Sequence, residues 1–401
     1  MIFYIGLMLI LIYNKYNSNR NGGVCMKKCL VMPDSFKGTL SSNEICNIMK
    51  EQINFHFPKC QVVSVPVADG GEGTVDCFLA ISKNAEKVDV VSSGPYGEKV
   101  NTYYAKIGDT AIIEMASTAG LPMVENNKNP RKTTTYGVGE MIKKAVNNGC
   151  KEIILGLGGS CTNDGGVGMA RALGTVFYDE NGNEFSPYSD EFVKISKIDN
   201  SKTREFLKDC KITAMCDINN PLCGENGASY VFAPQKGADE ETVKELDLNL
   251  LHLSKIILKD LDKDVLNMAG SGAGGGIGAG VVAFLNGNLK SGIDTILDFI
   301  DFNNIVEGAD MIFTGEGKID SQSLSGKVVI GISKRAKEKN IPVTAVVGTI
   351  GEGAEGAYDL GVTSIFSINR QAMDFEKSRY KSGENLEKTM DSILRFYKSI
   401  K

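Results

Sequence analysis

The sequence predicts an α/β protein in which a parallel-sheet domain made from both chain ends carries an inserted second α/β domain. Strand and helix patterns alternate from residue 26, and the same alternation returns near the C-terminus. Between them, the residues from about 95 to 290 follow a different pattern with apparent strand pairs. We therefore expect one domain over 26–94 and 291–401, and an inserted domain over 95–290.

The N-terminal part of this pattern begins with a buried strand over 27–35, KKCLVMPDS. A helix follows over 41–57, and the next strand covers 61–69. The helix takes Ser41 or Ser42 as its N-cap, because a serine hydroxyl accepts a hydrogen bond from an amide of the first turn. Strand, helix and strand in this order are typical of a parallel sheet.

The C-terminal part repeats this order, with strands over 309–317 and 341–349 on either side of a helix over 325–340. Ligand sites of α/β proteins lie at the carboxyl ends of strands, so a discontinuous domain predicts a cleft there. The middle of the chain contains, in order, strands over 100–108 and 110–116, a helix over 136–149, a strand over 151–159, a mixed region to about 235 and a long polar helix over 238–261.

Length and composition favour a sizeable core and a small-molecule partner. The 401 residues are 42% hydrophobic, and the formal net charge is -5 without a long run of Lys or Arg. We expect no nucleic-acid and no membrane partner, because both favour a basic surface. Ten cysteines lie scattered without a Cys-x-x-Cys pair, and with only two histidines they give neither a zinc motif nor a disulfide framework. Reduced thiols indicate a cytoplasmic protein.

Residues 1–25 do not fit the alternating pattern. The apolar run over 1–13 is shorter than the ~20 residues that cross a bilayer. In a signal peptide the basic residues precede the apolar run, whereas Lys15 and Arg20 follow it here. Our hypothesis is that Met26 is the natural start and that the preceding residues are an upstream extension.

The stretch GLGGSCTNDGGVGMARALG, residues 156–174, joins a predicted strand to a predicted helix through a glycine-rich turn. Such a turn can bind an anion, because the unpaired amides of the first helical turn and the helix dipole both favour negative charge. Ser160, Thr162 and Asn163 would then add hydrogen bonds to phosphate oxygens, and Asp164 offers a carboxylate for a metal or a proton. The alternative is that Asn163 or Asp164 caps the helix and the glycines make a tight turn.

Three further segments have the same character. The segment 67–79 places Asp69, Gly70 and Gly71 after a strand, and 314–328 places Gly315, Glu316 and Gly317 after another, with Lys318, Asp320 and Lys327 close by in sequence. The segment 270–280 includes Gly274 and Gly275 before an apolar helix. Turn chemistry alone is a poor explanation for four such segments.

The named glycine motifs are absent or weak. Residues 270–275 match G-x-G-x-x-G, but the preceding residues make a poor strand, which disfavours an NAD enzyme. Val328 follows Gly326 and Lys327, so there is no P-loop, and Thr162 stands where a nucleophile elbow needs glycine. Glycine-rich anion sites with carboxylates nearby favour Mg²⁺-assisted phosphoryl transfer, in which one carboxylate accepts the proton of a hydroxyl. The carboxylates near predicted strand ends or in glycine-rich turns are Asp34, Asp69, Asp164, Asp217 and Asp320.

Seven motifs follow one another along the chain: PDSFKGTLSS at 33–42, PVADGGEGTVD at 66–76, GGSCTNDGGVGMARALG at 158–174, CDINNPLCGENGAS at 216–229, FAPQKGA at 232–238, GAGGGIGA at 272–279 and TGEGKIDSQSLSGKV at 314–328. In these motifs and their order, from residue 26 to near the C-terminus, the chain resembles the bacterial type I glycerate kinases. The resemblance implies a flavodoxin-like (Rossmann-like) domain with an inserted α/β domain. It also implies ATP-dependent phosphorylation of D-glycerate with Mg²⁺, and the chain looks most like the enzymes that make 2-phosphoglycerate.

Other functions stay open at this stage. The product of a glycerate kinase is 2- or 3-phosphoglycerate, and a kinase of the same fold can act on another small hydroxy acid, such as tartronate or an aldonate. A non-catalytic sensor of ATP or a sugar acid would be expected to lose the carboxylates of the loops, whereas Asp69, Asp164 and Asp217 are kept. The oligomeric state, monomer or homodimer, is also open.

Site roles follow from this resemblance and the chemistry of the side chains. Lys37 is the candidate to grip the glycerate carboxylate or the transferred phosphate. Asp69, Asp164 and Asp217 are the candidates for general base, with Asp69 and Asp217 also as Mg²⁺ ligands. Arg131 binds a carboxylate or forms a salt bridge. The residues expected to line the phosphate or substrate pocket are Gly70, Gly71, Gly158, Gly159, Ser160, Thr162, Asn163, Gly165, Lys236, Gly274, Gly275, Gly315, Glu316, Gly317 and Lys318.

Overall fold

The computed structural model describes residues 26–400 except 69, 72, 83, 372 and 373, so the N-terminal extension and Asp69 lie outside the described residues. The chain divides into two compact units. The terminal unit joins the chain up to Val67 to the chain from Asp301 onward, and the inserted unit is Ala68–Ile300. The sequence placed these divisions after residues 94 and 290, and the extents of the folding domains stay a prediction.

The terminal unit contains a five-stranded parallel sheet with the order β2-β1-β12-β14-β16. When the strands are numbered in chain order within this unit, their order in the sheet is 2-1-3-4-5, which is the flavodoxin-like arrangement. The predicted fold class is therefore confirmed. The strands are β1 Lys28–Pro33, β2 Gln61–Ser64, β12 Met311–Gly315, β14 Val343–Val347 and β16 Val362–Ser367.

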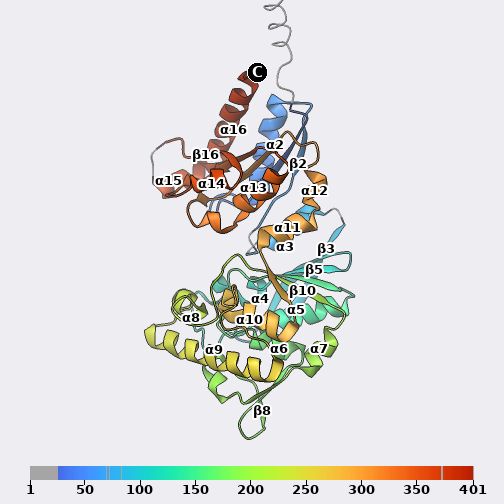
Figure 1. The fold of residues 1–401 in the computed structure, drawn as a ribbon, viewed down its shortest axis with the longest axis vertical. Coiled ribbons are helices and arrows are strands. Elements are labelled where there is room, and N and C mark those ends of the chain that lie inside the picture. Colours follow the sequence, from blue (N-terminus) through green and yellow to red (C-terminus); the bar gives the residue numbers. More distant parts are fainter. Residues whose placement is uncertain (1–25, 69, 72, 83, 372–373, 401) are drawn as a thin grey trace, which may run out of the picture. The chain divides into compact units, whose positions relative to one another are not determined.

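Helices cover both faces of this sheet, as a buried parallel sheet requires. Along β14, Val346 packs in the core that includes α2 and α16, whereas Ala345 and Val347 pack against α13 and α14. Alternate residues of a strand point to opposite faces, so these two helix pairs lie on opposite sides. Figure 1 shows α2 beside α16. The helices are α2 Ser42–His56, α13 Val328–Glu338, α14 Gly356–Asp359 and α16 Ser382–Ser399.

Local chemistry sets the start of α2 and the end of β2. Ser41 caps α2: its hydroxyl accepts from the amide of Glu44, and the Glu44 carboxylate accepts from the amide of Ser41 at 2.8 Å. The strand predicted over 61–69 is too long, since β2 ends at Ser64. Pro66 has no amide hydrogen to donate, although the amides of its two neighbours still bond to the segment beside them.

The inserted unit contains a six-stranded mixed sheet with the order β11-β10-β6-β5-β4-β3. The strands from β11 to β5 run parallel, and β5, β4 and β3 are antiparallel neighbours. A second, three-stranded sheet, β8-β7-β9, lies in the mixed region. The strands are β3 Ala85–Ser93, β4 Lys99–Ile107, β5 Thr110–Glu114, β6 Glu152–Gly156, β7 Val176–Tyr178, β8 Glu184–Phe185, β9 Lys197–Asp199, β10 Lys211–Met215 and β11 Asn288–Lys290.

The helices of the inserted unit enclose its hydrophobic core, and the long polar helix is present as α9, capped by Asp239. Its main helices are α3 Thr74–Ile81, α5 Tyr136–Asn147, α6 Val167–Leu173, α9 Glu240–Leu261, α10 Ala273–Leu285 and α11 Gly292–Phe299. Short elements of this unit are α4 Ala116–Ala119, α7 Ser201–Phe206, α8 Ala228–Phe232, η1 Leu121–Val124, η2 Ser189–Lys194 and η3 Pro234–Lys236. Those of the terminal unit are α12 Phe302–Ile305, α15 Phe375–Ser378, η4 Ser323–Ser325, η5 Arg379–Lys381, β13 Lys318–Ile319 and β15 Thr349–Ile350.

Within the described part of the chain, no helix combines the length and the apolar character needed to span a membrane.

Candidate active site

In the inserted unit, the parallel strands β5, β6, β10 and β11 end at one edge of the sheet, and most of the predicted site residues follow these ends. Gly156 is paired with Met215 at the ends of β6 and β10. The loops after these strands contain Ser160 and Asp217. This edge is where α/β proteins bind ligands.

The glycine-rich segment around Gly70 packs directly onto this edge. The amide of Gly158 donates to the carbonyl of Gly70 at 3.1 Å. A Cβ on Gly156 would lie 2.6 Å from the Gly70 carbonyl oxygen, and one on Gly158 would lie 2.6 Å from the Cα of Gly71. These glycines are therefore needed for backbone-to-backbone contact between two loops, a use distinct from contact with a ligand.

The third glycine-rich segment packs against the same loop from α10. The amide of Gly165 donates to the carbonyl of Gly275 at 3.0 Å, and the Thr162 hydroxyl donates to the carbonyl of Gly274 at 3.4 Å. A Cβ on Gly275 would collide with the carbonyl of Thr162, and Gly275 also has φ +76°. The structure thus brings three of the four predicted segments together within the inserted unit.

Asp164 is buried beneath this loop, with both carboxylate oxygens occupied. They accept from the amide and hydroxyl of Thr135 at 2.7 and 2.9 Å, and from the amides of Gly166 and Gly168 at 3.2 Å each. Burial raises the pKa of Asp164, and the hydrogen bonds from Thr135 oppose this. The expectation that the first turn of α6 exposes unpaired amides is wrong for these two glycines, because Asp164 already accepts from them.

Lys236 is buried, although a lysine before a glycine commonly lies in an exposed turn. Its side chain is 2% exposed, and its ammonium donates to the Ser160 hydroxyl at 2.8 Å and to the Thr162 carbonyl at 2.7 Å. Burial lowers the pKa of Lys236 to about 8, while Cys161 and Asp164 partly offset this. The predicted contact of Lys236 with phosphate stays a prediction, and the contact observed is with the loop.

The residues from Gly159 to Asn163 form the part of this loop that we call the 159–163 turn. Gly159 has φ +75°, and a Cβ built on it would lie 3.3 Å from the Cβ of Ala116. Asn163 is fully buried, and its side-chain nitrogen donates to the Ser229 hydroxyl at 3.0 Å. Its Oδ1 has no hydrogen-bond partner among the described residues. A buried polar atom of this kind marks a place where a ligand can complete the bonding.

Asp217 and Arg131 have protein partners. Asp217 follows β10, and one carboxylate oxygen accepts from the amide of Gly292 at the start of α11, at 2.8 Å. Arg131 forms a salt bridge with Glu245 at 2.6 Å and donates to the Thr242 hydroxyl at 2.6 Å, so the salt-bridge alternative applies to it.

The fourth glycine-rich segment lies in the terminal unit, where the strand order reverses between β1 and β12. The amide of Asp34 donates to the carbonyl of Gly315. The amide of Gly348 donates to the backbone carbonyl of Glu316 at 3.1 Å. Glu316 is thereby fixed between the ends of neighbouring strands. Its side chain is 5% exposed, and its Oε1 has no hydrogen-bond partner within the described ranges.

The pKa of Glu316 is raised to about 7, mainly by burial. A hydrogen bond with Ser323 and the charge of Lys327 lower it, while Asp34 and Asp320 raise it further. A carboxyl group with this pKa exchanges its proton near neutral pH, which suits acid–base chemistry.

Two lysines predicted for the site, Lys37 and Lys318, are exposed in the terminal unit. Lys37 lies in the turn after β1, and its amide nitrogen would lie 3.4 Å from a Cβ on Gly317. Lys318 forms an ion pair with Asp320 at 2.9 Å.

Sequence reasoning missed Thr135 and Ser229 as partners of the site. Thr135 accompanies Asp164, and Ser229 accompanies Asn163. The run of three threonines in NPRKTTTYG, directly before a helix, was a usable signal for the first. Ser229 is the last residue of the motif CDINNPLCGENGAS at 216–229, which was a usable signal for the second.

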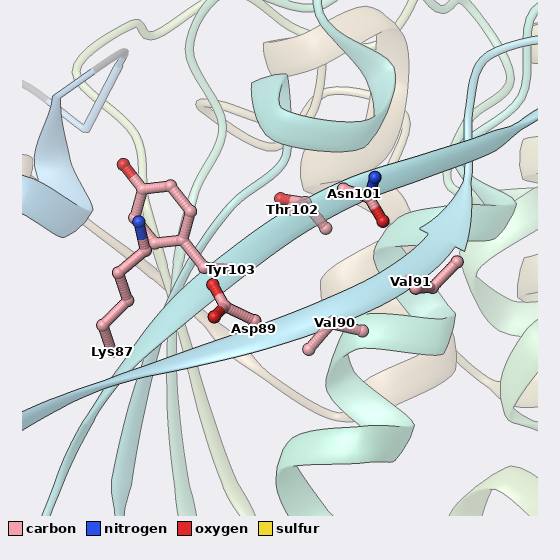
Figure 2. Close-up of a pocket in the computed structure, with 7 residues that line it drawn as sticks. All are labelled: Lys87, Asp89, Val90, Val91, Asn101, Thr102 and Tyr103. Carbon is pink, nitrogen blue, oxygen red and sulfur yellow. The ribbon is translucent and has the colours of Figure 1, made fainter.

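A pocket of about 490 Å³ lies elsewhere in the inserted unit, on strands β3 and β4 (Figure 2). The Lys87 ammonium lies 3.8 Å from the centroid of the Tyr103 ring, and the Tyr103 hydroxyl donates to Asp76 at 3.0 Å. None of the predicted site residues lines this pocket, and we assign it no part in catalysis.

Comparison with known proteins identifies the family. The model of the glycerate kinase family matches residues 29–398. The chain belongs to the glycerate kinase family. It is therefore an enzyme that transfers a phosphoryl group to an alcohol acceptor, with ATP as the donor expected of a kinase.

Relatives cover nearly the whole chain. A glycerate kinase of Bacillus cereus is 42% identical over 374 residues, which cover 92% of this chain and 98% of the relative. A glycerate 2-kinase of Escherichia coli K12 is 44% identical over 344 residues, 85% of this chain and 90% of the relative. A crystal structure from Salmonella typhimurium LT2, assigned as a glycerate kinase 2, has a TM-score of 0.82 and 37% identity, and covers 92% of this chain and 98% of that chain.

Proposed function

We propose that this glycerate kinase phosphorylates the 2-hydroxyl of D-glycerate and releases 2-phosphoglycerate. The relative from Escherichia coli that is named a glycerate 2-kinase supports this choice of hydroxyl. The observation that carries the proposal is the 159–163 turn at the carboxyl end of β6, where the buried ammonium of Lys236 holds the hydroxyl of Ser160. A donor backed by a positive charge is suited to the anionic groups of this reaction.

In the proposed reaction, a carboxylate accepts the proton of the 2-hydroxyl, and the oxygen bonds to the γ-phosphorus of ATP. The bond from that phosphorus to the β–γ bridging oxygen breaks, and ADP leaves. Asp217 is a candidate for the carboxylate because it follows β10 at the site edge and is partly exposed. Asp69 remains a candidate from the sequence. Asp164 is fully engaged with protein donors, and we assign it a positioning role.

Magnesium fits this donor set as an ion that accompanies ATP. Among the residues that the structure describes, no three His, Cys, Asp or Glu side chains are grouped to hold a metal. Mg²⁺ commonly takes one or two carboxylates together with phosphate oxygens and water. Asp217 and Asp69 would supply these carboxylates, and the bound ion would neutralise charge on the β- and γ-phosphates.

The terminal unit is proposed to contribute Lys37 and Glu316. The exposed ammonium of Lys37 suits the phosphate that is transferred, because a lysine side chain can follow a moving anion. Glu316 is a second candidate for the proton acceptor, since its raised pKa lies near neutral pH. The described cysteines are free thiols, which supports a place for the enzyme in the reducing cytoplasm.

The test is the release of ADP by the purified full-length chain with ATP and Mg²⁺. D-glycerate, L-glycerate, tartronate and a longer aldonate are compared as acceptors. The proposal expects the highest kcat/KM with D-glycerate. A higher value with another acid would replace the substrate, and no ADP with any acid, from protein that binds ATP, would support the sensor.

A further inference from the structure

The charge of Lys236 lies in the interior of the inserted unit without an ion pair to a described carboxylate. The side chain is 2% exposed, and the acceptors of its ammonium are the Ser160 hydroxyl and the Thr162 carbonyl, both neutral. Burying an ammonium in this way is unfavourable unless another interaction offsets it. The enzyme keeps this charge directly behind the 159–163 turn.

The hydrogen bond from Lys236 determines whether the Ser160 hydroxyl is the donor or the acceptor in this contact. An ammonium can only donate, so the Ser160 oxygen is the acceptor in this contact. The hydroxyl hydrogen of Ser160 has no acceptor among the described residues. Ser160 is 7% exposed, and it can complete its bonding by donating to a ligand oxygen.

The remaining donors of the loop argue for a small, singly charged anion. The amides of Gly166 and Gly168, which would serve a phosphate chain, donate to Asp164. Among the side chains of the turn, Ser160 offers a hydroxyl donor with one buried cation behind it, and Asn163 offers its unpaired Oδ1 as an acceptor. A phosphate chain carries several charges and calls for several cations, whereas one donor backed by a cation, next to an amide oxygen, matches a single carboxylate next to a hydroxyl.

We propose that Lys236 is a positioning residue that directs the Ser160 hydroxyl to the carboxylate of the hydroxy acid, which makes the 159–163 turn the acid subsite. This inference rests on the proposed function, since it places the acceptor of that reaction. The nucleotide then binds to other parts of the protein.

Proton uptake provides a test that does not depend on turnover. Burial holds the pKa of Lys236 at about 8, and the titratable groups that face it are Cys161 and Asp164, while Lys128 packs against the adjacent Gly237. A carboxylate bound to Ser160 adds a nearby negative charge and raises the pKa of the ammonium. D-glycerate binding at pH 8.5 therefore takes up protons.

Calorimetric titration at pH 8.5 in two buffers of different ionisation enthalpy measures this uptake. D-glycerate is titrated into the protein with and without ADP, and ADP is titrated alone. We expect uptake with D-glycerate, none with ADP, and none with D-glycerate in Lys236→Met. Lys244→Met, which removes an exposed charge from α9, is the matched control and keeps the uptake. Uptake with ADP alone, or no uptake with D-glycerate, would overturn the inference.

Ser160→Ala keeps the buried lysine and tests the same contact if Lys236→Met does not fold. Loss of a hydrogen bond to a charged group raises the KM for D-glycerate by roughly 10- to 100-fold. The KM for ATP stays unchanged, and Ser160→Thr, which keeps a hydroxyl, restores part of the loss. A rise in the KM for ATP instead would assign the turn to the nucleotide. Wild-type turnover of D-glycerate in the same preparation separates this result from failure of the proposed function.

Discussion

Replacing Glu316 with Gln should stabilise the terminal unit at alkaline pH and reduce catalysis. The carboxyl pKa rises from 4.5 to about 7 on folding, at a side chain that is 5% exposed. At 1.36 kcal/mol per pKa unit, the ionised carboxylate costs about 3 kcal/mol of folding free energy. A raised folded pKa means that stability is full below pH 4.5 and is lost as the pH rises through about 7. Glutamine keeps the shape without the charge, so the variant avoids this loss.

Thermal unfolding at pH 5 and pH 9 measures the difference. For a domain of 150–250 residues, 1 kcal/mol changes Tm by about 2–4 °C. We therefore expect the Tm of Glu316→Gln to exceed that of the wild type by roughly 6–12 °C at pH 9, and by much less at pH 5. Glu352→Gln, an exposed position of the same unit, is the control and should change Tm little at either pH. A Glu316→Gln variant that is no more stable than wild type at pH 9 would refute the reasoning, because it would show that the carboxylate is satisfied by its surroundings. A lower kcat in the stabilised variant would show that the Glu316 carboxylate lowers stability but is needed for activity.

Three further predictions concern the inserted unit. Asp164→Asn should lower stability by about 3 kcal/mol, because an amide nitrogen would face backbone donors; a variant with wild-type Tm and no turnover would restore a catalytic role for Asp164. Gly275→Ala should lower Tm and raise the KM for D-glycerate, because its Cβ would push against Thr162. A variant with the wild-type Tm and the wild-type KM would show that the segment around Gly275 does not support the 159–163 turn. Asp217→Asn should cut kcat by orders of magnitude in a folded protein, and an unchanged kcat would remove Asp217 from the catalytic candidates.

The strands at both chain ends could be predicted because buried parallel strands are continuous apolar runs. Residues 28–33 and 343–347 lie inside the segments predicted from such runs. The ends of elements were predicted less accurately: β2 ends at Ser64, although the amides of Val65 and Val67 still donate to the carbonyls of Val31 and Pro33. The sheet order needs long-range pairing of β1 with β12, which no local pattern specifies.

The sequence predicted which residue types make up the site better than it predicted which of these residues are in contact. The glycine-rich loops are visible in the sequence, yet the contact of Gly158 with Gly70 depends on how the loops pack on the sheet. Lys236 and Ser160 are 76 positions apart, and Asp164 and Thr135 are 29 apart. Spacing predicts neighbours within a helix or strand, so these contacts between distant segments required the structure.

Phosphorus NMR of the product from the purified chain, ATP, Mg²⁺ and D-glycerate is the most direct test of the proposed reaction. We predict the signal of 2-phosphoglycerate, which reports the substrate, the reaction and the acceptor hydroxyl together. A signal of 3-phosphoglycerate would contradict the choice of hydroxyl. No phosphoglycerate from a folded sample that binds ATP would contradict the proposed function itself.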